Sequence, residues 1–244
     1  MLKTLDKAIQ VLNCFTKEKT SWGVRELARE LNTSHTIISR ILKTFENNGF
    51  LTQDKETKKY YLGLKFIEFS QIIQERISVT EEVLPIMETI SELTKESIFL
   101  TWKENNEGVT LAIAESEERI KFSVSIGTRT PLYVGASCKS IMAYVTDDEK
   151  MKIIEEAELP DSDISELLEE LNQINRQGWS YTCGEYSDQV FGLSVPLFDN
   201  KQQIIASITI AGPAYRINEE KKAVMLKVLQ EETRRIQQMI YNLI

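Results

Sequence analysis

Histidine and cysteine are scarce in this chain of 244 residues, and their scarcity excludes several kinds of site. His35 is the only histidine, so we expect no structural zinc site, which would need several His or Cys ligands. Cys14, Cys138 and Cys183 are too few and too scattered for a disulfide framework, and none lies in a C-x-x-C pair. We therefore expect reduced thiols, no metal and no cofactor.

Long hydrophobic runs are also missing. The longest, such as SIFLTW and SITIAG, fall far short of the roughly 20 apolar residues that cross a bilayer. No basic and then apolar segment of the secretory type opens the chain. These absences predict a cytoplasmic protein with no membrane partner.

The common catalytic motifs are absent from the sequence. It contains no G-x-x-x-x-G-K-[ST], G-x-G-x-x-G, G-x-S-x-G or H-E-x-x-H. Acidic runs such as EEAELPDSD have the composition of solvated helix faces and loops. We therefore expect no catalytic residues, and a protein that is not an enzyme.

Charge is distributed unevenly along the chain. The formal net charge at pH 7 is −8, which by itself argues against a nucleic-acid partner. Residues 1–63, however, hold 11 Lys and Arg against 7 Asp and Glu, a balance of +4, and the remainder holds 18 against 30, a balance of −12. A basic head on an acidic body indicates that only the first quarter meets an anionic partner.

The basic head has the pattern of a helix-turn-helix. Apolar residues recur at helical spacing over residues 2–15 and again over 24–31. A third helix follows after only Asn32 and Thr33, because Asn tolerates the left-handed conformation of a tight turn and Thr33 or Ser34 can cap the next helix. Two helices joined by so short a turn form the helix-turn-helix unit.

The third helix has one apolar and one polar face. Ile38, Ile41, Leu42 and Phe45 form the stripe expected to face the core, and no acidic residue precedes Glu46. A helix face without carboxylates does not repel the phosphate oxygens of DNA. An exposed apolar side chain on that face can contact the methyl group of a thymine. The residues expected to contact DNA from this helix are Ser34, His35, Thr36, Ile37, Ser39, Arg40 and Lys43. Because imidazole titrates near neutral pH, a phosphate contact by His35 would depend on pH.

A basic β-hairpin is expected after this helix. The run FLTQDKETKKYYLG has two short β-prone segments around a polar turn, with Lys55, Lys58 and Lys59 at or near its tip. Such a wing contacts phosphates or a minor groove. The helices and the wing together predict a winged helix-turn-helix that binds double-stranded DNA, and the alternative is a small helical module that binds protein.

Several long segments of the chain have a recognisable family pattern. They are LDKAIQVL, VRELARELNTSHTIISRILKTFENNGFL, KYYLGLKFIEF, IGTRTPLYVGASCKSIMAYV and GLSVPLFDNKQQIIASITIAGPAYRI. In these segments the sequence shows a resemblance to the IclR family of bacterial transcription regulators. The resemblance implies a winged helix-turn-helix, a linker helix and a GAF-like effector-binding domain. It also implies a homodimer or homotetramer that responds to a small-molecule effector, often a small organic acid.

Two departures from the family pattern bear on specificity. Residues 32–37 read NTSHTI where the family usually has a Gly-apolar-Pro-Lys-Ser-Thr run, which leaves the operator sequence open. Residues 137–140 read SCKS where the family tends to have Ala-Gly-Lys-Ala, which leaves the identity of the effector open.

The acidic body is expected to be an α+β domain. We divide the chain into a DNA-binding domain at 1–63, a linker helix at 64–80 and an effector-binding and oligomerisation domain at 81–244. The broad apolar surface of residues 64–77 favours packing against a second copy, and Pro85 starts or bends the next helix. The order of strands and helices predicts an antiparallel sheet covered by helices. Strands are expected at 97–103, 108–116, 119–126, 189–198 and 202–212, and helices at 140–145, 147–157, 165–178 and 217–243.

The segment GTRTPLYVGASCKS is the best candidate for a binding pocket. Gly127, Gly135 and Ala136 let a ligand approach the backbone, and Ser137 is expected to open a helix whose free N–H groups attract a carboxylate. By the family resemblance, effector-contacting positions are matched by Ala136, Ser137, Gly192, Thr209 and Ala211. Gly135 and Glu185, which lies in the loop before FGLSVP, complete the residues expected to bind the effector. Gly192 and Ala211 stand where some members have Cys and Ser, which favours a larger or more apolar effector, unless both are merely small core residues. Aromatic walls are expected from Tyr133, Trp179 and Tyr181.

The sequence thus predicts a transcription regulator that binds a palindromic operator and responds to a small organic acid. Two alternatives remain open. Cys138 or Cys183 could make it a thiol-based redox regulator if one thiol has a depressed pKa. A ligand-responsive scaffold that never binds DNA is the other, and it would lack the steep salt dependence of phosphate contacts.

Overall fold

The computed structural model describes the backbone of residues 2–76 and 79–243, and the side chains of these ranges except 73–81 and 241–243. The chain divides into two compact units, Met1–Ile77 and Ser78–Ile244. Each is considered by itself. Within the described residues, no helix is both long enough and apolar enough to cross a membrane.

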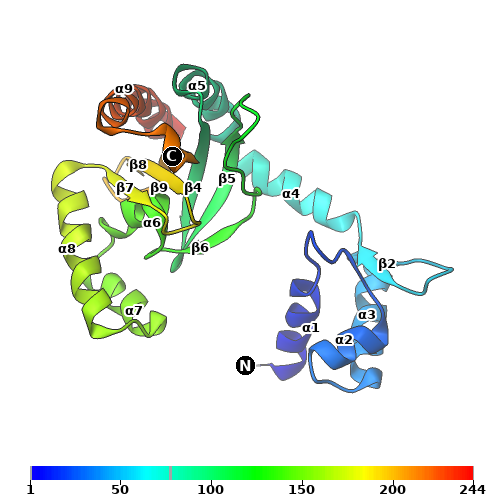
Figure 1. The fold of residues 1–244 in the computed structure, drawn as a ribbon. Helices are drawn as coiled ribbons and strands as arrows, with labels where there is room; N and C mark the ends of the chain where they lie inside the picture. The colour runs from blue at the N-terminus through cyan, green and yellow to red at the C-terminus, as the bar shows by residue number, and fades with distance from the viewer. Residues whose placement is uncertain (1, 77–78, 244) are drawn as a thin grey trace. The chain divides into compact units, whose positions relative to one another are not determined.

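The first unit is a three-helix module with a small sheet, followed by a further helix (Figure 1). The three strands are antiparallel in the order β1-β3-β2, so β2 and β3 form the expected wing and β1 pairs with the wing's second strand. The elements are α1 (Lys3–Asn13), β1 (Ser21–Trp22), α2 (Val24–Glu30), α3 (His35–Asn47), β2 (Leu51–Gln53), β3 (Tyr60–Leu62) and α4 (Lys65–Arg76).

The turn between α2 and α3 has the predicted geometry. Asn32 has a φ of 44°, the left-handed conformation that Asn tolerates better than most residues. Ser34 caps α3, since its side chain accepts a hydrogen bond from the N–H of Ile37. These two residues therefore set the angle at which α3 leaves α2.

The core of the first unit is built from the predicted apolar stripes. Val11, Leu27, Ile38 and Leu42 are fully buried, one or two from each helix. The apolar residues Leu64, just before α4, and Ile67, Phe69 and Ile72 on α4 are instead exposed. The helix expected at 64–77 is observed as α4, and Ile77 lies outside the described residues.

The second unit contains one six-stranded antiparallel sheet in the order β6-β5-β4-β9-β8-β7. The mixture of this sheet with flanking helices confirms the predicted α+β class. Its elements are α5 (Val79–Thr94), β4 (Ser97–Glu104), β5 (Glu107–Ala114), β6 (Arg129–Pro131), α6 (Gly135–Met142), α7 (Asp147–Ala157), α8 (Asp161–Gln177), β7 (Ser180–Cys183), β8 (Val190–Phe198), β9 (Ile204–Pro213), the 3-10 turn η1 (Ala214–Arg216) and α9 (Glu219–Leu243).

Helices cover both faces of this sheet (Figure 1). Helices α5 and α9 pack together on one face and bury side chains such as Ile98, Leu193 and Ile208. Helix α6 lies against the other face, and α7 and α8 share a second apolar cluster with it. Alternate residues of the central strands therefore point toward α5 and α9 or toward α6.

Four details of this unit differ from the sequence prediction. Residues 119–126 do not form a strand and pair with no described strand, and β6 pairs with β5 only over Glu107–Val109. The short strands β6 and β7 were not expected. Helix α6 begins at Gly135, two residues before Ser137. Pro85 does not start its helix, because α5 begins at Val79 and contains Pro85.

Candidate functional site

The outward face of α3 is exposed along its whole length. Every α3 residue expected to contact DNA is exposed, including Ile37, which leaves 47% of its apolar side chain open to solvent. Lys43 forms an ion pair of 2.9 Å with Glu46, the first acidic residue of the helix. The acid-free part of the surface therefore runs from Ser34 to about Arg40.

Thr44 also belongs to this surface, although sequence reasoning missed it. It is exposed, and its hydroxyl donates a hydrogen bond to the backbone carbonyl of Arg40 one turn earlier. The spacing of four residues from Arg40 was the signal that could have found it, because residues i and i+4 share a helix face. Thr44 thus extends the polar face by one turn.

The wing turn is held by one carboxylate. Oδ1 of Asp54 accepts hydrogen bonds from the N–H of Glu56, 3.0 Å, and from the N–H of Thr57, 2.6 Å. The hydrogen bonds from the N–H and the hydroxyl of Thr57, with a smaller contribution from the N–H of Glu56, hold the pKa of Asp54 below its usual value. Lys55 and Lys58 are exposed on the turn.

The third lysine of the wing differs from the other two. Lys59 lies 3.4 Å from Oε1 of Glu26 on α2, and its side chain is half-buried. The positive charge of Lys59 is therefore partly neutralised by the carboxylate of Glu26. Lys55 and Lys58 are the stronger candidates for phosphate contacts.

The second unit contains a cavity between the sheet and the first turn of α6. The cavity has a volume of about 60 Å³. This volume is enough for roughly four to six water molecules. Six of the seven predicted effector-binding residues line it, and Glu185 does not. The lining residues are Phe99, Thr101, Thr110, Phe122, Val124, Thr130, Gly135, Ala136, Ser137, Thr182, Tyr186, Val190, Phe191, Gly192, Thr209 and Ala211.

Strand register explains why residues far apart in sequence meet at this cavity. Thr182 on β7 pairs with Gly192 on β8, and Gly192 pairs with Ala211 on β9, so the three form one row across the sheet. A Cβ on Gly192 would lie 3.0 Å from Cβ of Ala136. Gly192 therefore lines the cavity and also allows the first turn of α6 to approach the sheet.

Hydroxyl groups on the sheet hold the first turn of α6 in place. The hydroxyl of Ser180 donates to the carbonyl of Ala136, 2.6 Å, and that of Ser207 donates to the carbonyl of Ser137, 2.9 Å. The N–H of Ala136 donates to Oγ1 of Thr182, 3.1 Å. Sequence reasoning missed Ser180, Thr182 and Ser207, although polar side chains at alternate positions of apolar strands could have indicated them.

The start of α6 already has a carboxylate beside it. The N–H of Gly135 donates to Oε2 of Glu185 at 3.3 Å, and Nζ of the buried Lys139 lies 2.7 Å from the same oxygen. Lys139 also pairs with Glu170 at 2.7 Å. The expectation of unoccupied N–H groups at this helix end is therefore wrong for Gly135 and Ala136.

The aromatic walls of the cavity are not the predicted ones. Tyr181 follows the strand alternation away from the cavity and packs with Trp179 against the cluster under α5 and α9, and Tyr133 packs against the α7 and α8 cluster. The aromatic lining comes instead from Phe99, Phe122, Tyr186 and Phe191.

The two cysteines of the redox alternative lie in different surroundings. Cys138 is fully buried, and burial raises the pKa of its thiol to about 12. A thiol at that pKa forms almost no reactive thiolate at neutral pH, which argues against a redox role for Cys138. Cys183 is exposed at the end of β7. No cluster of three or more potential metal ligands occurs in the part of the chain that the structure describes.

Family models match both units of the chain. The IclR helix-turn-helix domain matches residues 4–55, and the model described as bacterial transcriptional regulator IclR C-terminal matches residues 71–238. The chain belongs to the IclR family. It is therefore a DNA-binding transcription regulator of that family, as the resemblance implied.

Relatives of the IclR family match over nearly the full length. The transcriptional regulator KipR of Bacillus subtilis is 27% identical, covering 98% of this chain and 97% of the relative. The regulator KdgR of Escherichia coli is 28% identical over 90% of this chain and 86% of its own length. The crystal structure of the Thermotoga maritima IclR superposes with a TM-score of 0.75 at 27% identity, covering 98% and 99% of the two chains.

A further IclR homologue, from Microbacterium hydrocarbonoxydans, has been solved in complex with 4-hydroxybenzoate. It superposes with a TM-score of 0.82 at 19% identity, covering 96% of this chain and 98% of that one. At that identity the likeness shows a shared fold.

Proposed function

We propose that this regulator binds a palindromic operator as a homodimer or homotetramer, with α3 in the major groove and the wing on the flanking backbone. The acid-free, exposed face of α3 and the lysines on the wing turn of the same unit support this proposal. The exposed apolar side chains of α4, such as Ile67 and Ile72, suit packing against a second copy. Two recognition helices related by a twofold axis read half-sites a whole number of turns apart, ~10 base pairs each.

Neutralising the wing should weaken binding to all DNA sequences equally. In a variant with Lys55→Gln and Lys58→Asn, Asn keeps the left-handed conformation of position 58, where φ is 58°. Loss of two phosphate contacts per wing lowers the slope of log affinity against log salt by about 1.8 for each bound subunit. Fluorescence anisotropy across a salt series, on operator and unrelated duplexes, measures both effects.

The matched control for the wing removes the same two charges elsewhere. Lys95→Asn and Lys201→Gln lie in the second unit, and Lys95 also has a left-handed backbone, with a φ of 61°. This variant should keep the wild-type slope. A wing variant that lost affinity for the operator alone would contradict the phosphate role.

We propose that the effector is a small, largely apolar acid that occupies the cavity beside α6. The observation that carries this proposal is the lining: among its described residues none is charged, and it combines aromatic rings with six threonine or serine hydroxyls. Such walls suit a ring-sized apolar body with one polar end. The complex of a structural relative with 4-hydroxybenzoate is consistent with a ligand of this class.

The polar end of the effector would lie near the first turn of α6, where the helix dipole favours negative charge. Ser137 and Thr182 supply hydroxyl groups there. The Glu185 carboxylate beside Gly135 opposes a second negative charge, and Lys139 offsets part of that opposition. Glu185 therefore tunes how strongly the cavity accepts an anion.

Calorimetry with matched small molecules tests the effector class. Benzoate and 4-hydroxybenzoate should bind, benzamide should bind more weakly because it is uncharged, and acetate should not bind measurably because it lacks the apolar body. Glu185→Gln should tighten benzoate about five-fold, roughly 1 kcal/mol of relieved repulsion, and leave benzamide unchanged. If acetate bound as tightly as benzoate, or if Glu185→Gln weakened benzoate, this assignment would be wrong.

The curated relatives are named as transcriptional regulators, which supports regulation over catalysis as the proposed activity. A thiol switch at Cys138 is not favoured, because this thiol is buried and burial raises its pKa to about 12.

A further inference from the structure

The loop between β5 and β6, residues 115–128, forms one wall of the cavity. Phe122 and Val124 line the cavity, and the Phe122 ring packs edge to face on Phe99 and on Tyr186, with centroids 5.6 Å apart in both cases. The segment around Phe122 lacks a partner strand. Its position therefore depends on side-chain contacts rather than on a ladder of backbone hydrogen bonds.

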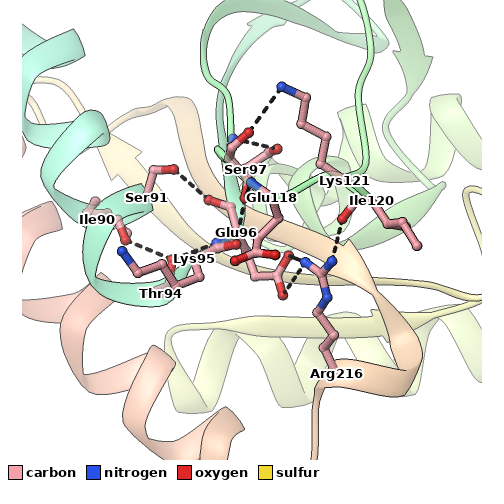
Figure 2. Close-up of polar contacts among 11 residues, drawn as sticks. Ile90, Ser91, Thr94, Lys95, Glu96, Ser97, Glu118, Ile120, Lys121 and Arg216 are labelled. Atoms are coloured by element: carbon pink, nitrogen blue, oxygen red, sulfur yellow. Dashed lines mark hydrogen bonds and ion pairs between the residues drawn. The ribbon is translucent and has the colours of Figure 1, made fainter.

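Arg216 supplies a contact to the middle of this loop. Its Nη1 donates to both carboxylate oxygens of Glu96, at 3.2 and 3.4 Å, and its Nη2 donates to the backbone carbonyl of Ile120. Figure 2 shows the guanidinium between the two partners, with one edge toward Glu96 and the other toward Ile120. The planar guanidinium of Arg216 thus connects Glu96, the residue before β4, to the backbone of the loop.

Glu96 is a rigid anchor for this guanidinium. Its side chain is only 2% exposed, and it packs against Gly212 so closely that a Cβ on that glycine would lie 2.2 Å from the carboxylate. Burial raises the pKa of Glu96, and the charge of Arg216 opposes that rise. A buried carboxylate paired with a guanidinium has little freedom to move, which restricts the position of the guanidinium as well.

The base of the loop is held separately. The hydroxyl of Ser116 donates to the carbonyl of Lys95 at 2.6 Å, and the N–H of Ser116 donates to Oγ of Ser97 at 3.2 Å. At the other end, the N–H of Gly127 donates to the carbonyl of Thr110 at 2.7 Å. Between these ends, Arg216 adds a contact from outside the loop, two residues before Phe122.

We propose that Arg216, anchored by Glu96, positions the 115–128 loop so that Phe122 and Val124 close the cavity, and so sets ligand affinity without touching the ligand. Neither Arg216 nor Glu96 lines the cavity, so both are positioning residues. The proposal rests on the effector role proposed above for that cavity.

Arg216→Lys separates this role from simple stabilisation. Lysine keeps the positive charge beside Glu96, but its single ammonium lacks the planar fork that reaches Ile120 at the same time. Hydrogen exchange followed by mass spectrometry on the full chain should show roughly ten-fold faster exchange in peptides covering 117–126, with the rest of the domain unchanged. Benzoate affinity should fall about five-fold or more while the unfolding temperature stays near wild type.

Arg235→Lys is the matched control, since Arg235 also pairs with a glutamate but lies on α9. It should change neither exchange in the loop nor benzoate affinity. Unchanged exchange over 117–126 in Arg216→Lys, or acceleration spread over the whole domain, would overturn the positioning role. If Arg216→Lys speeds exchange in the loop but the wild-type protein binds no benzoate, the result would support the positioning role of Arg216. It would also contradict the proposed class of effector.

Discussion

Arg40→Ala should abolish discrimination between the operator and unrelated DNA while leaving the fold intact. Arg40 is exposed at the C-terminal end of the acid-free face of α3, where its guanidinium can reach the edge of a guanine. A bidentate contact of this kind is worth about 1–3 kcal/mol, so each half-site loses roughly 5- to 150-fold in affinity. Binding to unrelated duplexes, which depends on phosphate contacts, should change far less. Footprinting and anisotropy on both kinds of duplex measure the ratio.

Two controls make the Arg40 result interpretable. Arg176→Ala removes an exposed arginine from α8 in the second unit and should leave the ratio at its wild-type value. The unfolding temperature of Arg40→Ala should match wild type, because the side chain makes no buried contact. An unchanged footprint at unchanged stability would place base recognition elsewhere on α3.

The helix-turn-helix could be predicted closely because its determinants are local. Apolar stripes at helical spacing define the buried faces of α1, α2 and α3, and a left-handed Asn32 with a capping Ser34 defines the turn. The charge of each wing lysine could be read from the sequence as well. The pairing of Lys59 with Glu26 could not, because it joins the wing to α2 through tertiary packing.

The second unit shows where local patterns are insufficient. Residues 119–126 alternate like a strand, yet a strand also needs a partner, and no described strand pairs with this segment. The alternation puts Ile120, Phe122, Val124 and Ile126 on one face, yet only Phe122 and Val124 line the cavity, while Ile120 and Ile126 are exposed. The period-two pattern therefore did not identify which of these side chains face the interior.

The walls of the cavity illustrate the same limit. Tyr181 and Thr182 are neighbours on β7, and only the register of the sheet decides that Thr182 faces the cavity. Gly192 and Ala211 were predicted as effector-binding positions, and the register of β8 and β9 pairs them directly at the cavity. The Glu185 carboxylate at the start of α6 depends on a contact over 50 residues of sequence separation, which no local pattern encodes.

Ala211→Leu should abolish the effector response while operator binding in the absence of effector stays intact. Ala211 lines the cavity on β9 and is 5% exposed, so a leucine side chain there projects into a space of only about 60 Å³. Filling that space should weaken benzoate by roughly 100-fold, about 2.7 kcal/mol. The recognition helix lies in the other compact unit, so calorimetry should show the loss while anisotropy on the operator without effector remains at its wild-type value.

Ala114→Leu is the control that isolates cavity filling from overpacking. Ala114 on β5 is also 5% exposed, but it belongs to the cluster under α5 and α9 and does not line the cavity. Both variants should lose a similar amount of stability, about 1–3 kcal/mol, because each adds the same volume to a packed interior. Ala114→Leu should nevertheless keep benzoate binding and the change in operator affinity that benzoate causes. Equal loss of response in the two variants would mean that the response depends on the stability of the domain, and a normal response in Ala211→Leu would mean that the effector binds outside this cavity.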